Sequence, residues 1–293
     1  MNWWKNLKSK VRLKEPLKNH TSFRVGGPAK YFVEPKDSDD LKLLLNLVKR
    51  YKISFLLIGA GSNILINDHG VDGVVLRLGT PYFKRFSFKD NHLEVGAGCL
   101  LGKVVALTKE RSLSGAEFLT GIPGTVGGAL LMNAGAWGKN IADLVENVTV
   151  MDYNGSIKTL NKKDIKFGYR KSDLAKYIIL RTRLKLLKKN KVEIQDSIDR
   201  YLDYRQATQD FSRPSGGCIF KNPKGASAGR LIDLCGLKGK KIGGACISHK
   251  HANFIVNQGN AKARDILQLM KLVKKEVKKK FNIDLSPEIK IWQ

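Results

Sequence analysis

A cysteine stands in an unusual setting in the segment SGGCIFKNP, residues 215–223. Two glycines precede Cys218 and two apolar residues follow it. The backbone can therefore approach a neighbouring segment closely while Ile219 and Phe220 are fixed by packing. A thiol held in this way is rigid and can stay within reach of a substrate. Cysteine is also often buried for structural reasons, and the segment taken alone favours that second interpretation.

Two glycine-rich stretches in the first half of the chain could bind an anion. They are LLIGAGSNILI (56–66) and GIPGTVGGALLMNAGA (121–136). The first does not fit a Rossmann fingerprint, because Ile64 stands where Gly or Ala is required and an apolar extended run follows. Small residues around Ser62 and Thr125 can nevertheless expose successive backbone N–H groups to a diphosphate. Tight structural turns explain either stretch equally well, but the two together favour a dinucleotide.

The elements that must position these residues mix helices and strands irregularly. Leu41, Leu44, Leu45 and Val48 recur at helical spacing in residues 37–51. The same approach predicts further helices at 99–113, 192–209 and 261–281, and strands at 53–61, 73–79, 92–98, 147–155, 176–187, 251–257 and 286–292. This order indicates an α+β fold, not a doubly wound sheet, with a second unit beginning near residue 190.

The charge balance is extreme, since 53 Lys and Arg against 26 Asp and Glu give a net charge of +27. Such a charge raises the hypothesis of nucleic-acid binding. The basic residues are spread over the chain, however, without zinc-finger spacing or an RNP-like aromatic segment, and a positive field attracts anionic nucleotides as well. The four cysteines form no CxxC pair, and no apolar run reaches the roughly 20 residues of a membrane helix. We therefore expect a soluble cytoplasmic protein.

Seven segments occur in the same order as in a known family. They are NHTSFRVGGPA (19–29), IGAGSNILI (58–66), GIPGTVGGALLMNAGA, FGYRKS (167–172), SGGCIFKNP, HANFIVN and SPEIKI. In these segments the chain resembles the UDP-N-acetylenolpyruvoylglucosamine reductases. The resemblance extends from about residue 15 to the end of the chain, and seven ordered motifs are far more specific than one.

The resemblance implies a fold and an activity. The fold would be α+β: an FAD-binding domain of the PCMH or vanillyl-alcohol-oxidase type with two α+β subdomains (1–79 and 80–189), then a C-terminal α+β substrate-binding domain (190–293). The activity would be that of an oxidoreductase, a flavoprotein that uses FAD and NADPH to reduce UDP-N-acetylglucosamine enolpyruvate to UDP-N-acetylmuramate. This step belongs to peptidoglycan synthesis, and with it to cell wall biogenesis, cell shape, the cell cycle and cell division. We expect a monomer that binds no nucleic acid.

The resemblance also assigns site residues. Arg170, Cys218 and Glu288 match the three catalytic positions: hydride adds to the methylene carbon, Arg170 and Glu288 stabilise the resulting enolate, and Cys218 donates a proton. Taken singly, Arg170 could form a surface ion pair and Glu288 could protect an edge strand. FAD would contact Gly59, Ala60, Gly61, Ser62, Asn63, Ile64, Gly121, Ile122, Pro123, Gly124, Thr125, Gly127, Gly128, Asn133 and Gly135. The UDP-sugar would contact Tyr169, Arg205, Lys221 and Asn222.

The chain departs from the family pattern at two positions. The family more often has Ser at position 218 and a basic residue at 208, where this chain has Thr208. There is no long insertion of the kind that forms a substrate lid, which indicates the short type. His249 and His251 have the wrong setting for a metal site, and we expect no metal. Two other functions stay open: a basic nucleic-acid-binding protein, and an FAD oxidase of the same fold with another substrate.

The N-terminal arm raises a separate hypothesis. Trp3 and Trp4 lie among basic residues, a composition that suits an interfacial segment at an anionic membrane. We favour the simpler alternative, in which the tryptophans dock on the domain and the arm makes no membrane contact.

Overall fold

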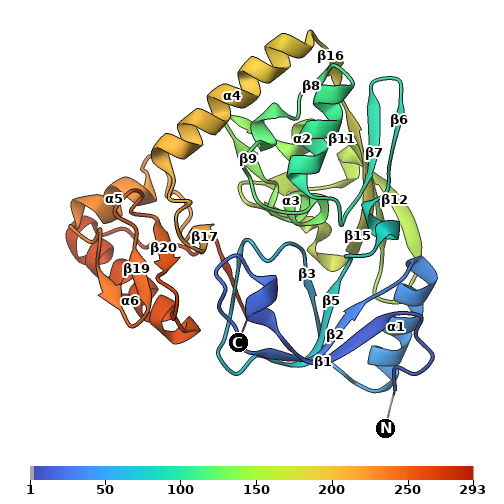
Figure 1. Ribbon diagram of the computed structural model, residues 1–293, viewed down its shortest axis with the longest axis horizontal. Helices are drawn as coiled ribbons and strands as arrows, with labels where there is room; N and C mark the ends of the chain where they lie inside the picture. Colours follow the sequence, from blue (N-terminus) through green and yellow to red (C-terminus); the bar gives the residue numbers. More distant parts are fainter. Residues whose placement is uncertain (1–2, 293) are drawn as a thin grey trace. The chain divides into compact units, whose positions relative to one another are not determined.

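The computed structural model describes residues 3–292, which form two compact units (Figure 1). The first unit contains the residues up to Leu13, Tyr31–Ala60 and Gly73–Tyr204. The second contains Lys14–Lys30, Gly61–Asp72 and the chain from Arg205 onward. Each unit has its own hydrophobic core. The division interleaves parts of the chain and differs from the contiguous boundaries 1–79, 80–189 and 190–293, which remain a prediction from the sequence.

Two sheets build most of the first unit. One has the strand order β1-β2-β5-β3, in which β3 and β5 are parallel. The other is antiparallel with the order β12-β11-β15-β7-β6. The strands are β1 (Lys10–Pro16), β2 (Pro28–Glu34), β3 (Phe55–Ile58), β5 (Val71–Arg77), β6 (Phe86–Lys89), β7 (His92–Gly96), β11 (Val145–Met151), β12 (Ile157–Asn161) and β15 (Ile178–Lys185).

Helices and short strand pairs complete this unit. The helices are α1 (Ser38–Arg50), α2 (Leu101–Glu110), α3 (Val126–Met132) and α4 (Lys191–Thr208), which runs on into the second unit. The pairs are β8 (Leu113–Ser114) with β16 (Leu187–Lys188), β9 (Gly135–Ala136) with β10 (Lys139–Asn140), and β13 (Phe167–Gly168) with β14 (Lys171–Ser172). Short 3₁₀ turns cover Pro81–Lys84, Glu117–Leu119, Ile141–Asp143, Lys162–Asp164 and Asp173–Lys176.

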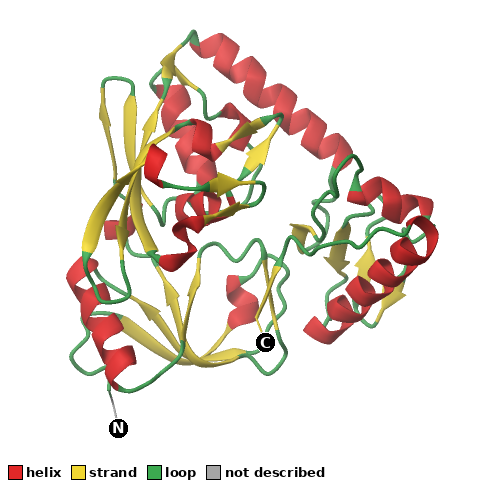
Figure 2. Ribbon diagram, turned by 180° about the vertical axis from the view of Figure 1, so that it is seen from behind, coloured by secondary structure: helices red, strands yellow, loops and turns green. Residues whose placement is uncertain are grey.

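The second unit combines a small antiparallel sheet with two helices (Figure 2). The sheet has the order β17-β20-β19-β18, from β17 (Ser215–Cys218), β18 (Lys241–Ile242), β19 (Ala245–Ile247) and β20 (Phe254–Asn257). Helix α6 (Ala263–Phe281) packs on β18 and β19 and also contacts α5 (Ala228–Leu234). Strand β4 (Ile64–Ile66) pairs in parallel with β21 (Lys290–Trp292), and Leu17–His20 forms a 3₁₀ turn.

Local sequence explains why these elements form. Asp37 caps α1 by accepting a hydrogen bond from the N–H of Asp40 at 2.9 Å, and the four apolar residues at helical spacing in this helix are buried. Helix α6 is capped from a distant segment, because the carboxylate of Asp68 accepts from the N–H groups of Ala263 at 2.8 Å and Arg264 at 3.2 Å. The acidic group also suits the positive end of the helix dipole.

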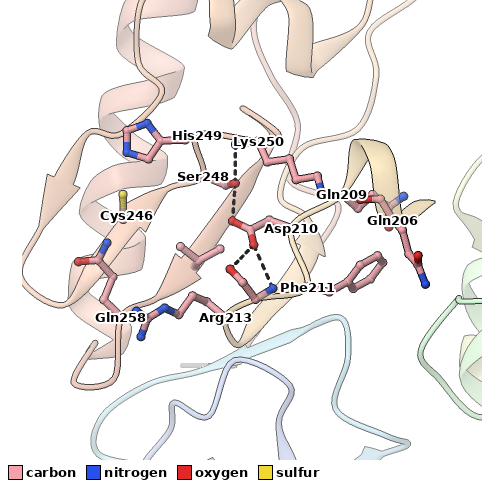
Figure 3. A pocket seen from close by; sticks show the side chains of 12 residues that line it. Gln206, Gln209, Asp210, Phe211, Arg213, Cys246, Ser248, His249, Lys250 and Gln258 are labelled. Atoms are coloured by element: carbon pink, nitrogen blue, oxygen red, sulfur yellow. Dashed lines mark hydrogen bonds between the residues drawn. The ribbon is translucent and has the colours of Figure 1, made fainter. Parts of the chain in front are cut away.

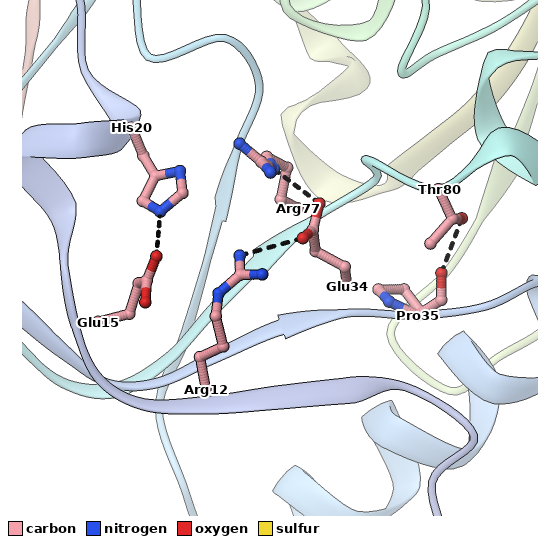
Figure 4. A network of polar contacts seen from close by, with 7 residues as sticks. All are labelled: Arg12, Glu15, His20, Glu34, Pro35, Arg77 and Thr80. Carbon is pink, nitrogen blue, oxygen red and sulfur yellow. Dashed lines mark hydrogen bonds and ion pairs between the residues drawn. The ribbon is translucent and has the colours of Figure 1, made fainter.

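A carboxylate between two arginines connects three strands of the first unit (Figure 4). Glu34 on β2 accepts from Arg12 on β1 at 3.0 Å and from Arg77 on β5 at 2.8 Å. Burial raises the pKa of Glu34, but the hydrogen bonds and charges of Arg77 and Arg12 outweigh it and hold the pKa below its usual value. Figure 4 also shows a pair within the second unit, where His20 Nε2 lies 2.7 Å from Glu15 Oε1.

The N-terminal arm is docked on the first unit. Trp3 is only 7% exposed and belongs to the hydrophobic core of that unit. Its ring lies 5.3 Å from that of Tyr31, and Trp4 lies 5.1 Å from the same ring. The apolar surface of Trp3 is therefore already covered by protein. Across residues 3–292, no helix combines the length and the apolar character that a membrane crossing would need.

Candidate active site

The two glycine-rich stretches meet in the first unit. Thr125 caps α3, its side chain accepting from the N–H of Gly128 at 3.3 Å. A Cβ atom at Gly59 would lie 2.7 Å from Oγ1 of Thr125, so the turn after β3 touches the start of α3. Residues 121–124, which lead into this helix, are partly or fully exposed. The two stretches are thus in contact through Gly59 and Thr125.

The second half of the first glycine stretch belongs to the second unit. Gly61 has a positive φ of 65°, and a Cβ there would lie 1.9 Å from the carbonyl oxygen of His20; only glycine fits. Asn63 donates from Nδ2 to the carbonyl of Glu288 at 3.2 Å and accepts from the N–H of Lys290 at 2.9 Å. The glycine turn is therefore hydrogen-bonded to the segment that carries Glu288.

Glu288 and Cys218 lie on hydrogen-bonded neighbouring segments of the second unit. The N–H of Glu288 donates to the carbonyl of Ile219, the residue after Cys218, at 2.8 Å. The N–H of Lys221 donates to the carbonyl of Ser286 at 2.9 Å, and Phe220 forms a β-bridge with Pro287. Both side chains are partly exposed. The fold thus brings together two segments that are far apart in the chain, one carrying Cys218 and the other Glu288.

The two glycines before Cys218 are required for different structural reasons. Ser215–Cys218 forms strand β17, which pairs with β20 and is interrupted by a bulge between Ser215 and Cys218. A Cβ at Gly216 would lie 2.2 Å from the ring of Phe23, and Gly217 has a φ of 73°. The first glycine allows close contact with an aromatic ring and the second allows the bulge. The close approach inferred from the sequence is confirmed.

Buried Asn253 supports this strand, and the sequence analysis did not single it out. Its side chain donates to the carbonyl of Phe220 at 2.8 Å and accepts from the N–H of the same residue at 2.9 Å. Its own carbonyl accepts from the N–H of Ile219 at 2.9 Å. The available signal was a polar side chain inside the apolar run HANFIVN, because a buried amide needs partners for both of its ends.

Arg170 lies in the first unit, at the turn between β13 and β14. Its φ is 53°, and its Nη1 donates to the carbonyl of Gly135 at 3.0 Å. The guanidinium carbon also lies 5.3 Å from the ring centre of Tyr169, which is 53% exposed. Asn133 is buried at the end of α3 and donates to the carbonyl of Gly168 in the same turn at 3.1 Å. The turn is therefore fixed to the last part of the second glycine stretch.

The expected substrate-binding residues have different surroundings. Arg205 is 9% exposed on α4 and donates to Oε1 of Gln209 at 3.3 Å. Asn222 accepts from the N–H of Ala228 at 3.0 Å, so its carbonyl oxygen helps to begin α5. Lys221 is partly exposed. These positions, like the others assigned by resemblance, remain predictions as ligand contacts.

A pocket of about 520 Å³ opens beside the end of α4 in the second unit (Figure 3). Asp210 lies within it and accepts from Ser248 at 2.7 Å and from the hydroxyl of Ser212 at 2.6 Å. Burial raises the pKa of Asp210, but hydrogen bonds from Ser212 and Ser248 outweigh it and lower the pKa below its usual value. The ionised carboxylate fastens the chain between α4 and β17 to the residue that follows β19.

The two histidines do not form a metal site with other ligands. Nδ1 of His251 accepts from the N–H of Asn253 at 3.1 Å, and its ring lies 4.6 Å from that of Phe254. Burial lowers the pKa of His251, so the ring is neutral at pH 7. Within residues 3–292 no group of three or more His, Cys, Asp or Glu side chains is arranged to hold a metal ion.

The residues of both glycine stretches suit a flavin dinucleotide. A side chain at Gly59 would meet Thr125 and one at Gly61 would meet the backbone of His20, so both glycines let this turn pack closely against neighbouring segments. Such turns bind pyrophosphate through N–H groups and need no cationic side chain. The fit of these turns is therefore consistent with the cofactor that the sequence implied.

Comparisons with known proteins agree along the chain. Residues 29–161 match the family model described as "FAD binding domain". Residues 208–292 match "UDP-N-acetylenolpyruvoylglucosamine reductase, C-terminal domain".

Similar whole proteins carry the same name. The UDP-N-acetylenolpyruvoylglucosamine reductase of Clostridioides difficile (strain 630) is 43% identical over 97% of this chain and 94% of its own. That of Bacillus subtilis (strain 168) is 40% identical over 96% and 94%. The crystal structure of the enzyme from Thermus caldophilus superposes with a TM-score of 0.84 at 38% identity, covering 98% of this chain and all of that one. The chain therefore belongs to the UDP-N-acetylenolpyruvoylglucosamine reductase family.

Proposed function

We propose that this protein reduces UDP-N-acetylglucosamine enolpyruvate to UDP-N-acetylmuramate with NADPH, through bound FAD, in the synthesis of peptidoglycan precursors. The observation that carries the proposal is the hydrogen-bonded pairing of the Cys218 and Glu288 segments, in a chain 43% identical to a named reductase. Neither the nucleic-acid-binding alternative nor an FAD oxidase with another substrate is favoured by this kinship.

The cofactor determines what the protein residues must do. Bound FAD would supply the redox chemistry, which is hydride transfer between NADPH and the methylene carbon of the enol ether. The chain must then stabilise negative charge next to the substrate carboxylate and add a proton to the adjacent carbon. Peptide groups of the two glycine stretches, from Gly59 to Ile64 and from Gly121 to Gly128, hold the dinucleotide.

Three side chains divide the remaining work. Arg170 pairs with the developing enolate through its planar guanidinium, which matches a carboxylate better than an ammonium does. Glu288, acting as a hydrogen-bonded acid, stabilises the same charge. Cys218 delivers the proton, for which a thiol suffices without a base, because the acceptor is a carbanion and no attack by sulfur is needed. Tyr169, Arg205, Lys221 and Asn222 are proposed contacts of the UDP-sugar.

The proposed reaction indicates where in the cell the protein works. Its substrates are cytoplasmic nucleotides, so we place the protein in the cytoplasm. We propose that it acts as a monomer without membrane contact; the docked position of Trp3 supports the second point.

Absorbance and turnover together test the function. Purified protein should carry flavin absorbance, or regain it with added FAD, and should oxidise NADPH over many turnovers only when the enolpyruvyl substrate is present. A protein that cannot be loaded with FAD would refute the flavoenzyme assignment. In another outcome, NADPH reduces the bound flavin but the enolpyruvyl substrate does not reoxidise it. That outcome would refute the substrate assignment and leave the flavoenzyme assignment intact.

A further inference from the structure

Asn133 joins the end of α3 to the turn that carries Arg170. Its Nδ2 donates to the carbonyl of Gly168 at 3.1 Å, two residues before Arg170. Its Oδ1 accepts from the N–H of Ala142 at 3.3 Å. The residue is only 6% exposed. Both ends of the amide are thus engaged by backbone groups inside the protein, which leaves the side chain oriented for support of the turn and not for contact with a cofactor.

The connection runs in both directions. Arg170 Nη1 donates to the carbonyl of Gly135, two residues after Asn133, at 3.0 Å. Ser172, on the other side of the turn, donates to the carbonyl of Leu131 at 3.1 Å. The segment from Leu131 to Gly135 therefore holds the turn before Arg170, after it and at the guanidinium itself.

The acceptor for the guanidinium is itself fixed. Gly135 lies in the β9–β10 hairpin opposite Asn140, and a Cβ at Gly135 would lie 2.3 Å from Oδ1 of that residue. At the hairpin tip, the ring of Trp137 stacks on Tyr201 of α4 at 4.9 Å, with 25° between the planes. A hairpin held at both ends gives Arg170 a constant partner.

Asparagine meets two demands at this position that no other residue type meets together. Its backbone adopts the left-handed conformation that ends α3, with φ of 43° and ψ of 57°, which only Gly, Asn and Asp tolerate readily. The position also requires one donor and one acceptor on a short planar group. Glycine has neither the donor nor the acceptor. An aspartate would place a second carboxylate oxygen against the carbonyl oxygen of Gly168, and the two would repel each other.

From this geometry we propose that Asn133 is a positioning residue for the proposed reaction: it fixes the turn from which Arg170 reaches the substrate, and it does not bind FAD through its side chain. The inference rests on the proposed function of Arg170. A shift of about 1 Å in a catalytic group can slow a reaction roughly a hundredfold. Loss of the Asn133 support should therefore be felt in the step that uses Arg170.

The test separates the two half-reactions by stopped flow. In Asn133→Asp, reoxidation of reduced flavin by the enolpyruvyl substrate should slow roughly ten- to a hundredfold. Flavin reduction by NADPH and the affinity for FAD should stay within about twofold. Asn282→Asp is the matched control, because Asn282 ends α6 in the same left-handed conformation in the second unit, and it should change neither half-reaction.

A double-mutant cycle asks whether Asn133 acts through Arg170. In the Arg170→Ala background, adding Asn133→Asp should slow substrate reduction by less than about twofold. If the two losses instead multiply, or if Asn133→Asp weakens FAD binding and slows both half-reactions alike, the proposal is overturned. A wild-type rate in Asn133→Asp overturns it too.

Two further results keep the test decisive. If Asn133→Asp does not fold, Asn133→Gly, which suits the left-handed backbone, takes its place with the same expectations. If Arg170→Ala itself reduces substrate at the wild-type rate, the proposed role of Arg170 fails, and that outcome differs from one in which Arg170 matters and Asn133 does not.

Discussion

At the scale of single residues, Cys218 carries the sharpest expectation. Cys218→Ser should retain much of the activity, because a hydroxyl can deliver a proton from the same position. Cys218→Ala should still allow NADPH to bleach the flavin but should stall at substrate reduction. Single-turnover stopped flow with each variant measures the two steps separately. Turnover of the enolpyruvyl substrate by Cys218→Ala at the wild-type rate would make Cys218 a structural residue.

The same thiol predicts a dependence on pH and on alkylation. A proton donor must be protonated, so wild-type activity should fall towards alkaline pH, and Cys218→Ser should weaken this fall. Iodoacetamide should inactivate wild type and spare the serine variant. Burial raises the pKa of Cys99, Cys235 and Cys246 despite nearby lysines, which lowers the fraction of each that is the reactive thiolate. Equal inactivation of both proteins would contradict this assignment.

Arg170 is expected to need its guanidinium, not only its charge. Arg170→Lys should lose roughly tenfold or more in substrate reduction, because an ammonium cannot offer two parallel N–H donors or keep the bond to Gly135. FAD content and flavin reduction by NADPH should be nearly unchanged. If stopped flow showed flavin reduction collapsing while substrate reduction stayed normal, Arg170 would have been assigned to the wrong half-reaction.

At the scale of elements, the sequence predicts local structure best at positions where the residue type has a single structural role, such as an apolar residue on the buried face of a helix. The spacing of Leu41, Leu44 and Leu45 predicts the buried face of α1, which the structure confirms. The glycines before Cys218 predict a close approach, but not that the neighbour is Phe23. A motif match gives residue types without side-chain directions. It assigned Asn133 to the cofactor, which stays a prediction, and it gave no sign of the hydrogen bonds of this side chain with Gly168 and Ala142.

Strands β1, β2 and β5 are connected by a carboxylate whose contribution should depend on pH. The pKa of Glu34 is lowered by Arg77 and Arg12. Its contribution to stability is therefore complete above the unfolded value near 4.3 and is lost as pH falls through the lower folded value. Glu34→Gln should cost about 1–2 kcal/mol in the free energy of unfolding at pH 7. Urea titrations should show this difference shrinking below pH 4.

Arg12 and Arg77 have a second type of contact that does not depend on Glu34. Both guanidinium groups also lie over the ring of Phe32, at 4.6 and 5.2 Å from its centre, so each keeps one interaction when Glu34 is neutralised. If the difference in the free energy of unfolding between wild type and Glu34→Gln stayed constant from pH 7 to pH 3, packing of the side chain and not its charge would connect these strands.

At the scale of the whole molecule, the interleaved division into units is what the sequence could not supply. Residues 14–30 and 61–72 belong with the C-terminal part of the chain, although nothing in their composition sets them apart. Their grouping comes from long-range contacts such as Asn63 with Glu288 and Asp68 with the start of α6. A pattern along the chain reports local periodicity, and it contains no signal for pairings across 195 or 225 residues.

Net charge is the property of the whole molecule that should appear in the kinetics. The chain carries +27, whereas NADPH and the UDP-sugar are anions, so their encounter with the protein is favoured at low salt. The screening length falls from about 30 Å at 0.01 M to about 8 Å at 0.15 M ionic strength. Over this range kcat/KM for both substrates should fall several-fold. The value of kcat should change little, because it describes the steps that occur after the substrates have bound.

The choice of salt separates a general field from a specific ion site. Ionic strength should be raised in parallel with sodium chloride and with choline chloride at a constant low potassium concentration. Because screening depends on charge and not on ion identity, the two series should superimpose. Series that differ would indicate a bound cation. A kcat/KM that did not change with ionic strength would mean that the basic residues, spread over both units, produce no useful field where the substrates enter.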